Sequence, residues 1–130
     1  MKILDSSGKN LAYVIKKEDI NKEKNFITDN NEEFQFASFN LQKGTVINDH
    51  IHPDQKREVY KTTEVLVVIE GEMIVKIYDD SKQLIEQVTL TTGDSICLIA
   101  GGHGILTTEN CKFIEVKQGP YTESIDKKLI

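Results

Sequence analysis

Short runs rich in apolar residues, most of them alternating with polar ones, recur along this chain with turn residues between them. Because side chains of a β-strand point alternately to opposite faces, each run predicts a strand with a buried face. Strands spaced about 8–12 residues apart are typical of an all-β sandwich or barrel. The predicted strands are residues 33–41, 64–69, 72–78, 84–90, 96–100 and 112–117, with turn signals at 79–82 and 92–94.

The N-terminal part departs from this pattern. Residues 11–15 predict one more strand, whereas residues 16–31 are highly charged and predict a helical turn or a loop. We therefore expect a single domain with an N-terminal arm at 1–33, a β-barrel at 34–121 and a C-terminal tail at 122–130. In small β domains such an arm often covers a sheet edge, in its own chain or in a partner subunit.

Length and charge restrict the class of protein. The chain has 130 residues, which suits one core, and its net charge of -5 with a single arginine argues against nucleic-acid and anionic-membrane partners. It has no apolar run of the roughly 18 residues needed to span a bilayer and no secretory signal pattern. Cys97 and Cys111 make no disulfide framework and are expected to act as small hydrophobic residues. We therefore expect a soluble, cytoplasmic protein.

The three histidines stand at informative positions. His50 and His52 form a His-x-His pair, and His103 lies among glycines at 101–104. Residues two apart in a strand point to the same side, so His50 and His52 can bind one ion together. The neutral imidazole is the commonest protein metal ligand. The alternatives are histidines that face solvent or that are hydrogen-bonded in the core.

The spacing around the pair matches a known motif. Gly44, His50 and His52 follow the pattern Gly-x5-His-x-His, and six residues lie between Glu64 and Gly71. This resembles the first motif of the cupin superfamily, in which the carboxylate follows the histidines after three or four residues. Here eleven residues lie between His52 and Glu64.

A second motif of the same superfamily follows in the expected order. Gly93 and Gly101 match the glycines of Gly-x5-Pro-x-Gly-x2-His-x3-Asn. Ile99 replaces the proline, His103 comes one position early, and Thr107 stands where the asparagine would be. The resemblance implies a double-stranded β-helix, the cupin jelly-roll barrel, which agrees with the strand pattern.

The resemblance also implies a metal site. It identifies His50, His52, Glu64 and His103 as ligands of a divalent transition metal: Fe, Mn, Ni, Co or Zn. Glu58 is the alternative carboxylate, because it has the same strand parity as Glu64. The spacing to Gly71 favours Glu64.

Residues 55–63 are an insertion relative to the motif. Arg57 and Tyr60 in this insertion are candidate substrate contacts or catalytic residues, because loops at a barrel mouth commonly carry such contacts. An ordinary exposed connection is an equal alternative.

The C-terminal part carries a further resemblance. Residues 114–121 are Ile-Glu-Val-Lys-Gln-Gly-Pro-Tyr, Asp126-Lys127 follows, and residues 50–53 are His-Ile-His-Pro. These stretches resemble the WbuC-like group, small cupin metalloproteins of bacterial surface-polysaccharide (O-antigen) gene clusters, although the Trp-Ala-Pro ending of several members is missing. The resemblance implies a role in surface-polysaccharide biosynthesis.

One face of the strand at 112–117 carries Glu115 and Lys117. If this face lines the cavity, Glu115 could orient a ligand histidine from the second shell and Lys117 could hold an anionic substrate group. If it faces solvent, the pair contributes little.

Three functions follow. The first is a metal-dependent cupin enzyme, of undetermined reaction, that acts on a small carbohydrate-derived or organic-acid molecule. The second is a metal-free nucleotide-sugar isomerase or epimerase with His50 and His52 as acid and base. The third is a non-catalytic module that binds a small ligand. By analogy with small cupins we expect a homodimer.

Overall fold

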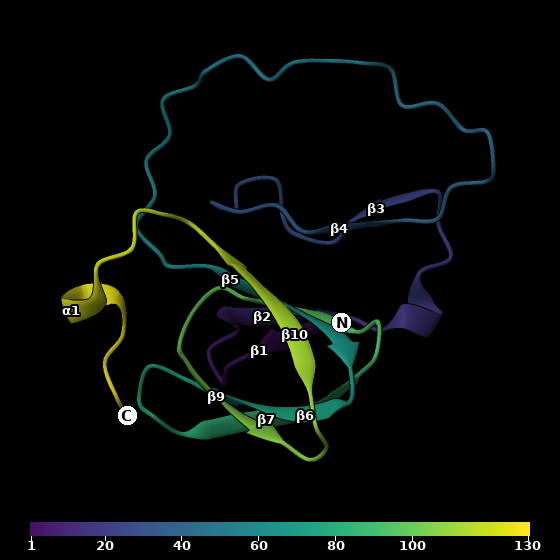
Figure 1. Cartoon of the computed structure of the whole chain (residues 1–130). Helices are drawn as coiled ribbons and strands as arrows, with labels where there is room; N and C mark the ends of the chain where they lie inside the picture. Colours follow the sequence, from purple (N-terminus) through teal and green to yellow (C-terminus); the bar gives the residue numbers. More distant parts are fainter.

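The computed structural model describes residues 1–130, and its regular secondary structure is almost entirely antiparallel β-strand (Figure 1). The all-β class is therefore confirmed. Two short helices, η1 (Lys17–Asp19) and α1 (Glu123–Asp126), complete the chain, and neither has the length or apolar character to cross a bilayer. The strands are β1 (Lys2–Leu4), β2 (Asn10–Ile15), β3 (Lys24–Phe26), β4 (Ala37–Phe39), β5 (Glu64–Glu70), β6 (Glu72–Tyr78), β7 (Leu84–Thr91), β8 (Ser95–Leu98), β9 (Gly102–Thr107) and β10 (Lys112–Lys117).

Two larger sheets pack face to face around the main core. One has the strand order β1-β2-β8-β5-β10, and the other has the order β7-β6-β9. Side chains of both sheets, such as Leu66 and Ile96 from the first and Met73 and Val75 from the second, form one cluster of fully buried residues. β3 and β4 form a separate, two-stranded sheet. The segment predicted as an N-terminal arm thus supplies β1 and β2 to the five-stranded sheet.

The central strands of the larger sheet are buried on both faces. A second cluster, which includes Tyr13, Val65 and Cys97, lies on the side of this sheet that faces away from the main core. This explains why the sequence of β5 is a continuous apolar run rather than an alternating one. Burial raises the pKa of the Cys97 thiol to about 12, with a smaller contribution from Glu32, so this cysteine is a neutral core residue.

β9 and β10 are the last strands of their sheets, and the core is open between them. Ile105 of β9 lies opposite Val75 and shares its inward direction, yet Ile105 is 40% exposed while Val75 is fully buried. Phe113 of β10 lies opposite the buried Val68 and is 39% exposed. The two sheets therefore form an open sandwich rather than a closed barrel.

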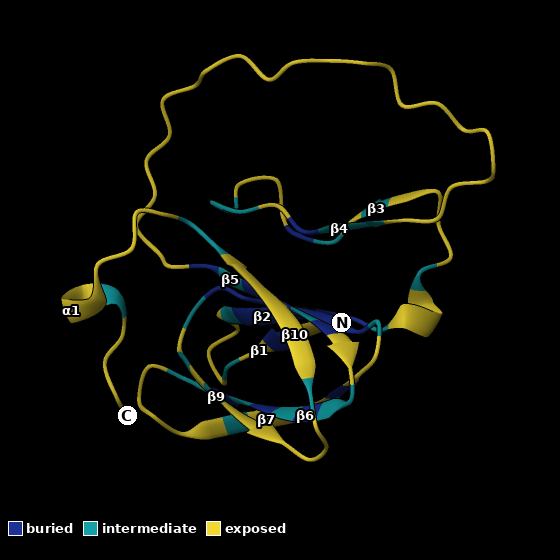
Figure 2. Ribbon diagram, viewed as in Figure 1, coloured by how far each residue is buried: buried dark blue, intermediate teal, exposed yellow.

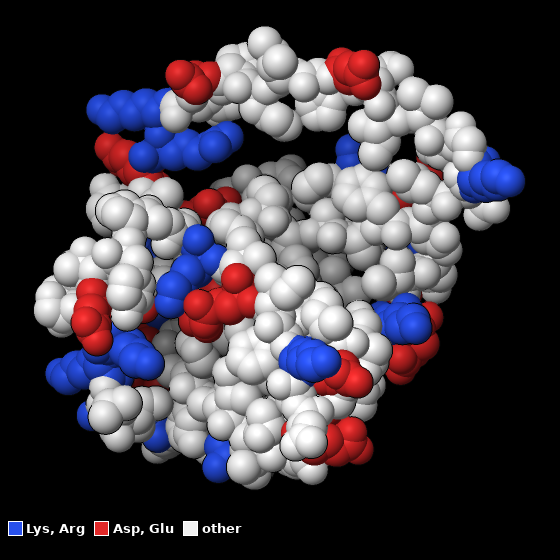
Figure 3. Space-filling view, in the orientation of Figure 1, with Lys and Arg blue, Asp and Glu red and all other residues white.

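Residues 40–62, which we call the arch, connect β4 to β5 without helix or strand. The arch stands away from the sheets (Figure 1), is exposed along its whole length (Figure 2), and has open space beneath it (Figure 3). Its C-terminal end is fastened by Glu33, whose carboxylate accepts hydrogen bonds from the backbone of Tyr60 at 3.0 Å and of Lys61 at 2.9 Å. The insertion at 55–63 is thus exposed from residue 55 to residue 62, and only its last residue, Thr63, is buried.

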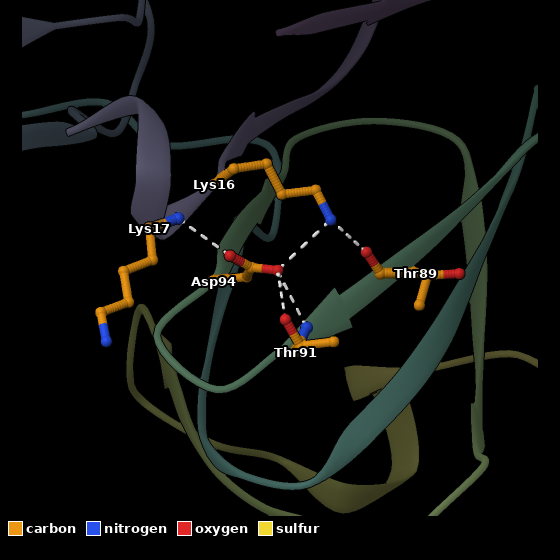
Figure 4. A network of polar contacts seen from close by, with 5 residues as sticks. All are labelled: Lys16, Lys17, Thr89, Thr91 and Asp94. Carbon is orange, nitrogen blue, oxygen red and sulfur yellow. Dashed lines mark hydrogen bonds and ion pairs between the residues drawn. The ribbon is translucent and has the colours of Figure 1, made fainter.

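A buried carboxylate joins β2 to the β7-β8 turn (Figure 4). Asp94 accepts hydrogen bonds from the backbone N–H of Lys17 and of Thr91, both at 2.9 Å, and from the hydroxyl of Thr91 at 3.2 Å. The ammonium of Lys16 lies 3.3 Å from the same carboxylate and also donates to the carbonyl of Thr89. The side chain of Asp94 is only 3% exposed, so these donors replace its hydration.

The predicted strands are confirmed where the apolar pattern is strong and fail where it is weak. Residues 33–41 form a strand only at Ala37–Phe39, so the predicted extent is wrong. β1, β3 and β9 were not predicted, because β1 and β3 have three residues each and β9 contains Gly102 and Gly104. The confirmed strands are β2, β5, β6, β7, β8 and β10, with ends that differ from the predictions by two residues or fewer.

Candidate functional site

A cleft of about 1160 Å³ opens between β9 and β10, at the side where the core is not closed. Its walls come from β9, from the end of β10, from the start of β5 and from the tail at 122–130. Four of the predicted site residues line it: Glu64, His103, Glu115 and Lys117. The strand face that carries Glu115 and Lys117 therefore lines a cavity.

Glu64 and His103 are in contact inside this cleft. Oε2 of Glu64 lies 3.4 Å from Nε2 of His103, although the two residues come from different sheets. The Glu64 side chain is 13% exposed and that of His103 is 32% exposed. Because His103 lies opposite the buried Ile77 of β6, its side chain points inward. The site thus has a carboxylate and an imidazole that converge from two walls.

The charges around Glu64 keep it ionised. Its contact with His103 is the main cause that lowers the pKa of Glu64 to about 2, while burial acts in the opposite direction. Hydrogen bonding with Glu115 and the charge of Lys117 lower it further. The pKa of Glu115 is raised, first by its hydrogen bond with Glu64 and then by burial. An ionised carboxylate beside an imidazole is a donor set that divalent transition metals accept.

Lys117 connects the cleft to the tail. Its ammonium lies 3.0 Å from Oδ2 of Asp126 in α1 and 3.4 Å from Oε2 of Glu115. The hydrogen bond to Asp126 is the main cause that raises the pKa of Lys117. The ring of Tyr121 lies 5.5 Å from the same ammonium. Lys117 is therefore a charged group with acidic partners in this conformation.

His50 and His52 lie in the arch, outside the cleft. Both are exposed, and their ring centroids are 5.0 Å apart. Nδ1 of His50 lies 2.8 Å from the carbonyl of Asn48. Since a carbonyl can only accept, Nδ1 is the nitrogen that donates in this hydrogen bond, and Nε2 is the nitrogen left free to bind a metal ion. The two rings lie next to each other, but in a segment without the strand that the prediction assumed, and the structure does not bring them to Glu64 and His103.

The other candidates of the insertion also lie in the arch. Glu58, Arg57 and Tyr60 are exposed, and the hydroxyl of Tyr60 donates to Oε2 of Glu58 at 3.3 Å. None of these three residues lines the cleft. No group of three or more His, Cys, Asp or Glu side chains is arranged to hold a metal ion in this conformation.

The sequence alone assigned no role to Tyr121 or to residues 126–130 of the tail, although they line the cleft. Asp126 is nine residues from Lys117, and the two residues lie on a helix and a strand that residues 118–122 separate. Neither helical nor strand periodicity connects such positions. The only signal available was the Asp-Lys pair at 126–127, which the WbuC-like resemblance singled out without a function.

Comparison with known proteins identifies one family. The model of the family DUF6016, described as a domain of unknown function, matches residues 20–90, which is more than half of the chain. The matched part contains His50, His52 and Glu64 but ends before His103 and β10. No curated protein and no solved structure matches the chain.

Proposed function

We propose that this chain, which belongs to the DUF6016 family, is a metal-binding cupin that takes a small carbohydrate-derived or organic-acid ligand in its cleft. The observation that carries the proposal is the contact between Glu64 and His103. These two residues are 39 positions apart, come from different sheets, and were both predicted as ligands of the same ion.

Under this proposal the arch closes onto the free edge of β9 and completes the double-stranded β-helix. Two observations support this closure. β9 is hydrogen-bonded to β6 only, and its inward-facing Ile105 is exposed. Val46, 78% exposed in the arch, has the same strand parity as His50 and His52, so it would cover this inward face as the histidines arrive. Closure would then add two imidazoles to the carboxylate and imidazole of the cleft.

The hydrogen bond of His50 supports the same role. Metal-binding histidines commonly donate their other N–H to a carbonyl or carboxylate, which fixes the tautomer. The hydrogen bond from Nδ1 of His50 to Asn48 already does this and leaves Nε2 as the donor atom. A bound ion would supply Lewis acidity for a carbonyl or hydroxyl oxygen of the ligand. The ligand's place in surface-polysaccharide biosynthesis follows from the resemblance of residues 114–121.

Metal content, measured by elemental mass spectrometry, tests the site. We expect near-stoichiometric metal in the wild type. In His50→Ala and Glu64→Ala we expect the metal content to be at least about tenfold lower. Glu70→Ala is the matched control, because Glu70 lies at the far end of the same strand and its side chain is 65% exposed. Glu58→Ala tests the alternative carboxylate.

Metal contents that differ from these expectations identify a different ligand or a different function. Metal that is lost in Glu58→Ala but retained in Glu64→Ala would assign the carboxylate to Glu58. Metal retained in His50→Ala would remove the His pair from the site. Absence of metal after reconstitution of a folded protein would overturn the proposal and favour His50 and His52 as the acid and base of an isomerase.

Limited proteolysis tests closure separately. Trypsin cleaves after Lys and Arg, and the arch offers Lys43, Lys56, Arg57 and Lys61. In the metal-free protein we expect the first cuts in the arch, because no strand or helix protects it. Added metal should slow these cuts in the wild type but not in His50→Ala. Equal cleavage rates with and without bound metal would contradict closure while leaving metal binding in place.

A further inference from the structure

The ion pair between Lys117 and Asp126 places a carboxylate of the tail inside the cleft. The side chains of Lys117 and Asp126 are 22% and 16% exposed. Water and salt therefore screen this pair less than they screen the surface pairs of the protein, such as Lys112 with Glu70. The carboxylate of Asp126 is thus paired with the ammonium of Lys117, the cation that a bound anion would use.

The tail has few other attachments. α1 contains no buried residue and no side-chain cap, and Ile125 and Leu129 are 79% and 87% exposed. One more contact holds it, since the side chain of Ile130 packs against Gly102, the neighbour of His103. Segments with few buried contacts open at low free-energy cost. Five of the 18 residues that line the cleft, Asp126 to Ile130, therefore belong to a wall that can move away.

Lys117 is the cation that the sheets contribute to the cleft, because Lys127 and Lys128, which also line it, belong to the tail. The carboxyl groups of Glu64 and Glu115 face the same cavity. In the metal-free protein, an anionic ligand without a cation to pair with would be repelled by these carboxyl groups. When a ligand carboxylate replaces Asp126, one negative group leaves as another arrives, so the net charge around Lys117 is unchanged. A neutral ligand offers no such exchange.

We propose that the cleft binds a ligand with a carboxylate group, that this carboxylate replaces Asp126 beside Lys117, and that the tail moves away as the ligand enters. This inference rests on the proposed function, because it takes the cleft as the ligand site and narrows the ligand to organic acids and sugar acids. It makes the tail an internal competitor of the ligand.

Acetate, the smallest carboxylate probe, tests the exchange, with neutral acetamide as its control at equal ionic strength. The chain has no tryptophan, so a Tyr121→Trp variant reports movement of the tail through its fluorescence. We expect a saturable change with acetate and none with acetamide. The acetate affinity itself is measured from amide chemical shifts of β9 and β10.

Variants of the tail and of the lysine give the decisive comparison. We expect Asp126→Asn to bind acetate at least about tenfold more tightly than the wild type, because the internal competitor is gone. Glu123→Gln, in the same short helix but outside the cleft lining, should bind as the wild type does. Lys117→Gln should lose acetate binding. Equal affinity in Asp126→Asn and Glu123→Gln, or binding that survives Lys117→Gln, would overturn the inference.

Metal content of the same variants separates the two proposals. Normal metal in Asp126→Asn without a gain in acetate affinity would overturn only the exchange at Lys117. A wild-type protein without metal that still binds acetate through Lys117 would overturn only the metal-binding function.

Discussion

The side chain of Asp94 joins the end of β2 to the end of β7, and its replacement tests how much this link stabilises the fold. Asp94→Asn keeps the shape but removes the charge and turns an acceptor into an N–H donor that faces other donors. We expect a loss of about 2 kcal/mol in the free energy of unfolding, measured by urea denaturation. Asp19→Asn is the control, because Asp19 is exposed on the neighbouring η1 helix. Equal effects of the two substitutions would contradict this role.

Asp94 also predicts a dependence of stability on pH. Burial opposes its ionisation, but the hydrogen bonds from Thr91, Lys17 and Lys16 outweigh burial and lower the pKa of Asp94 below its ordinary value of 3.8. A lowered pKa in the folded state stabilises the protein above the unfolded pKa, and this contribution disappears as the pH falls through the folded value. We therefore expect the free energy of unfolding to fall below about pH 4. In Asp94→Asn this decrease should be smaller, and an unchanged pH profile would contradict the assignment.

At the scale of elements, the connection between β5 and β6 depends on Gly71. Its φ is +90°, and a Cβ added there would lie 2.0 Å from the carbonyl oxygen of Asn110, which belongs to the β9-β10 turn. Gly8 has a similar φ of +85° but open space around it. We expect Gly8→Ala to cost about 1–2 kcal/mol of unfolding free energy from backbone strain alone. Gly71→Ala should cost roughly 3 kcal/mol or more, because backbone must move as well.

Thermal and urea unfolding of the two glycine variants check this difference. Equal losses would mean that the β9-β10 turn yields easily, in which case Gly71 is needed only for its backbone angle. The same position is the glycine of the first cupin-like motif, so this comparison also gives a structural reason for a glycine at that spacing.

The strand β10 shows what local pattern can and cannot predict. Its limits, Lys112–Lys117, and the shared face of Glu115 and Lys117 follow from two-residue alternation and are confirmed. The direction of that face does not follow. It is decided by the register with β5, in which Glu115 lies opposite the buried Leu66 and Lys117 lies opposite Glu64. This register pairs residues about fifty positions apart, which no local period encodes.

At the scale of the whole molecule, metal binding should stabilise the fold through closure of the arch. A ligand that binds only the folded state at a hundred times its dissociation constant adds about 2.7 kcal/mol to the free energy of unfolding. We expect an increase of this size with Mn²⁺ or Zn²⁺ in the wild type, measured by urea denaturation, and none in His50→Ala. Equal stabilisation of both proteins would place the bound ion away from the His pair.

The sequence by itself determined the all-β class and the limits of the strands with a strong apolar pattern. It also named Glu64 and His103 as candidate site residues, and these two residues are in contact in the structure. These follow from local periodicity and turn chemistry, which depend on neighbours in the chain. Only the tertiary structure decided that the core is open between β9 and β10, that the His pair stands apart in the arch, and that Asp126 pairs with Lys117. The physical reason is that strand register and the packing of distant segments set these contacts, and neither leaves a pattern in adjacent residues.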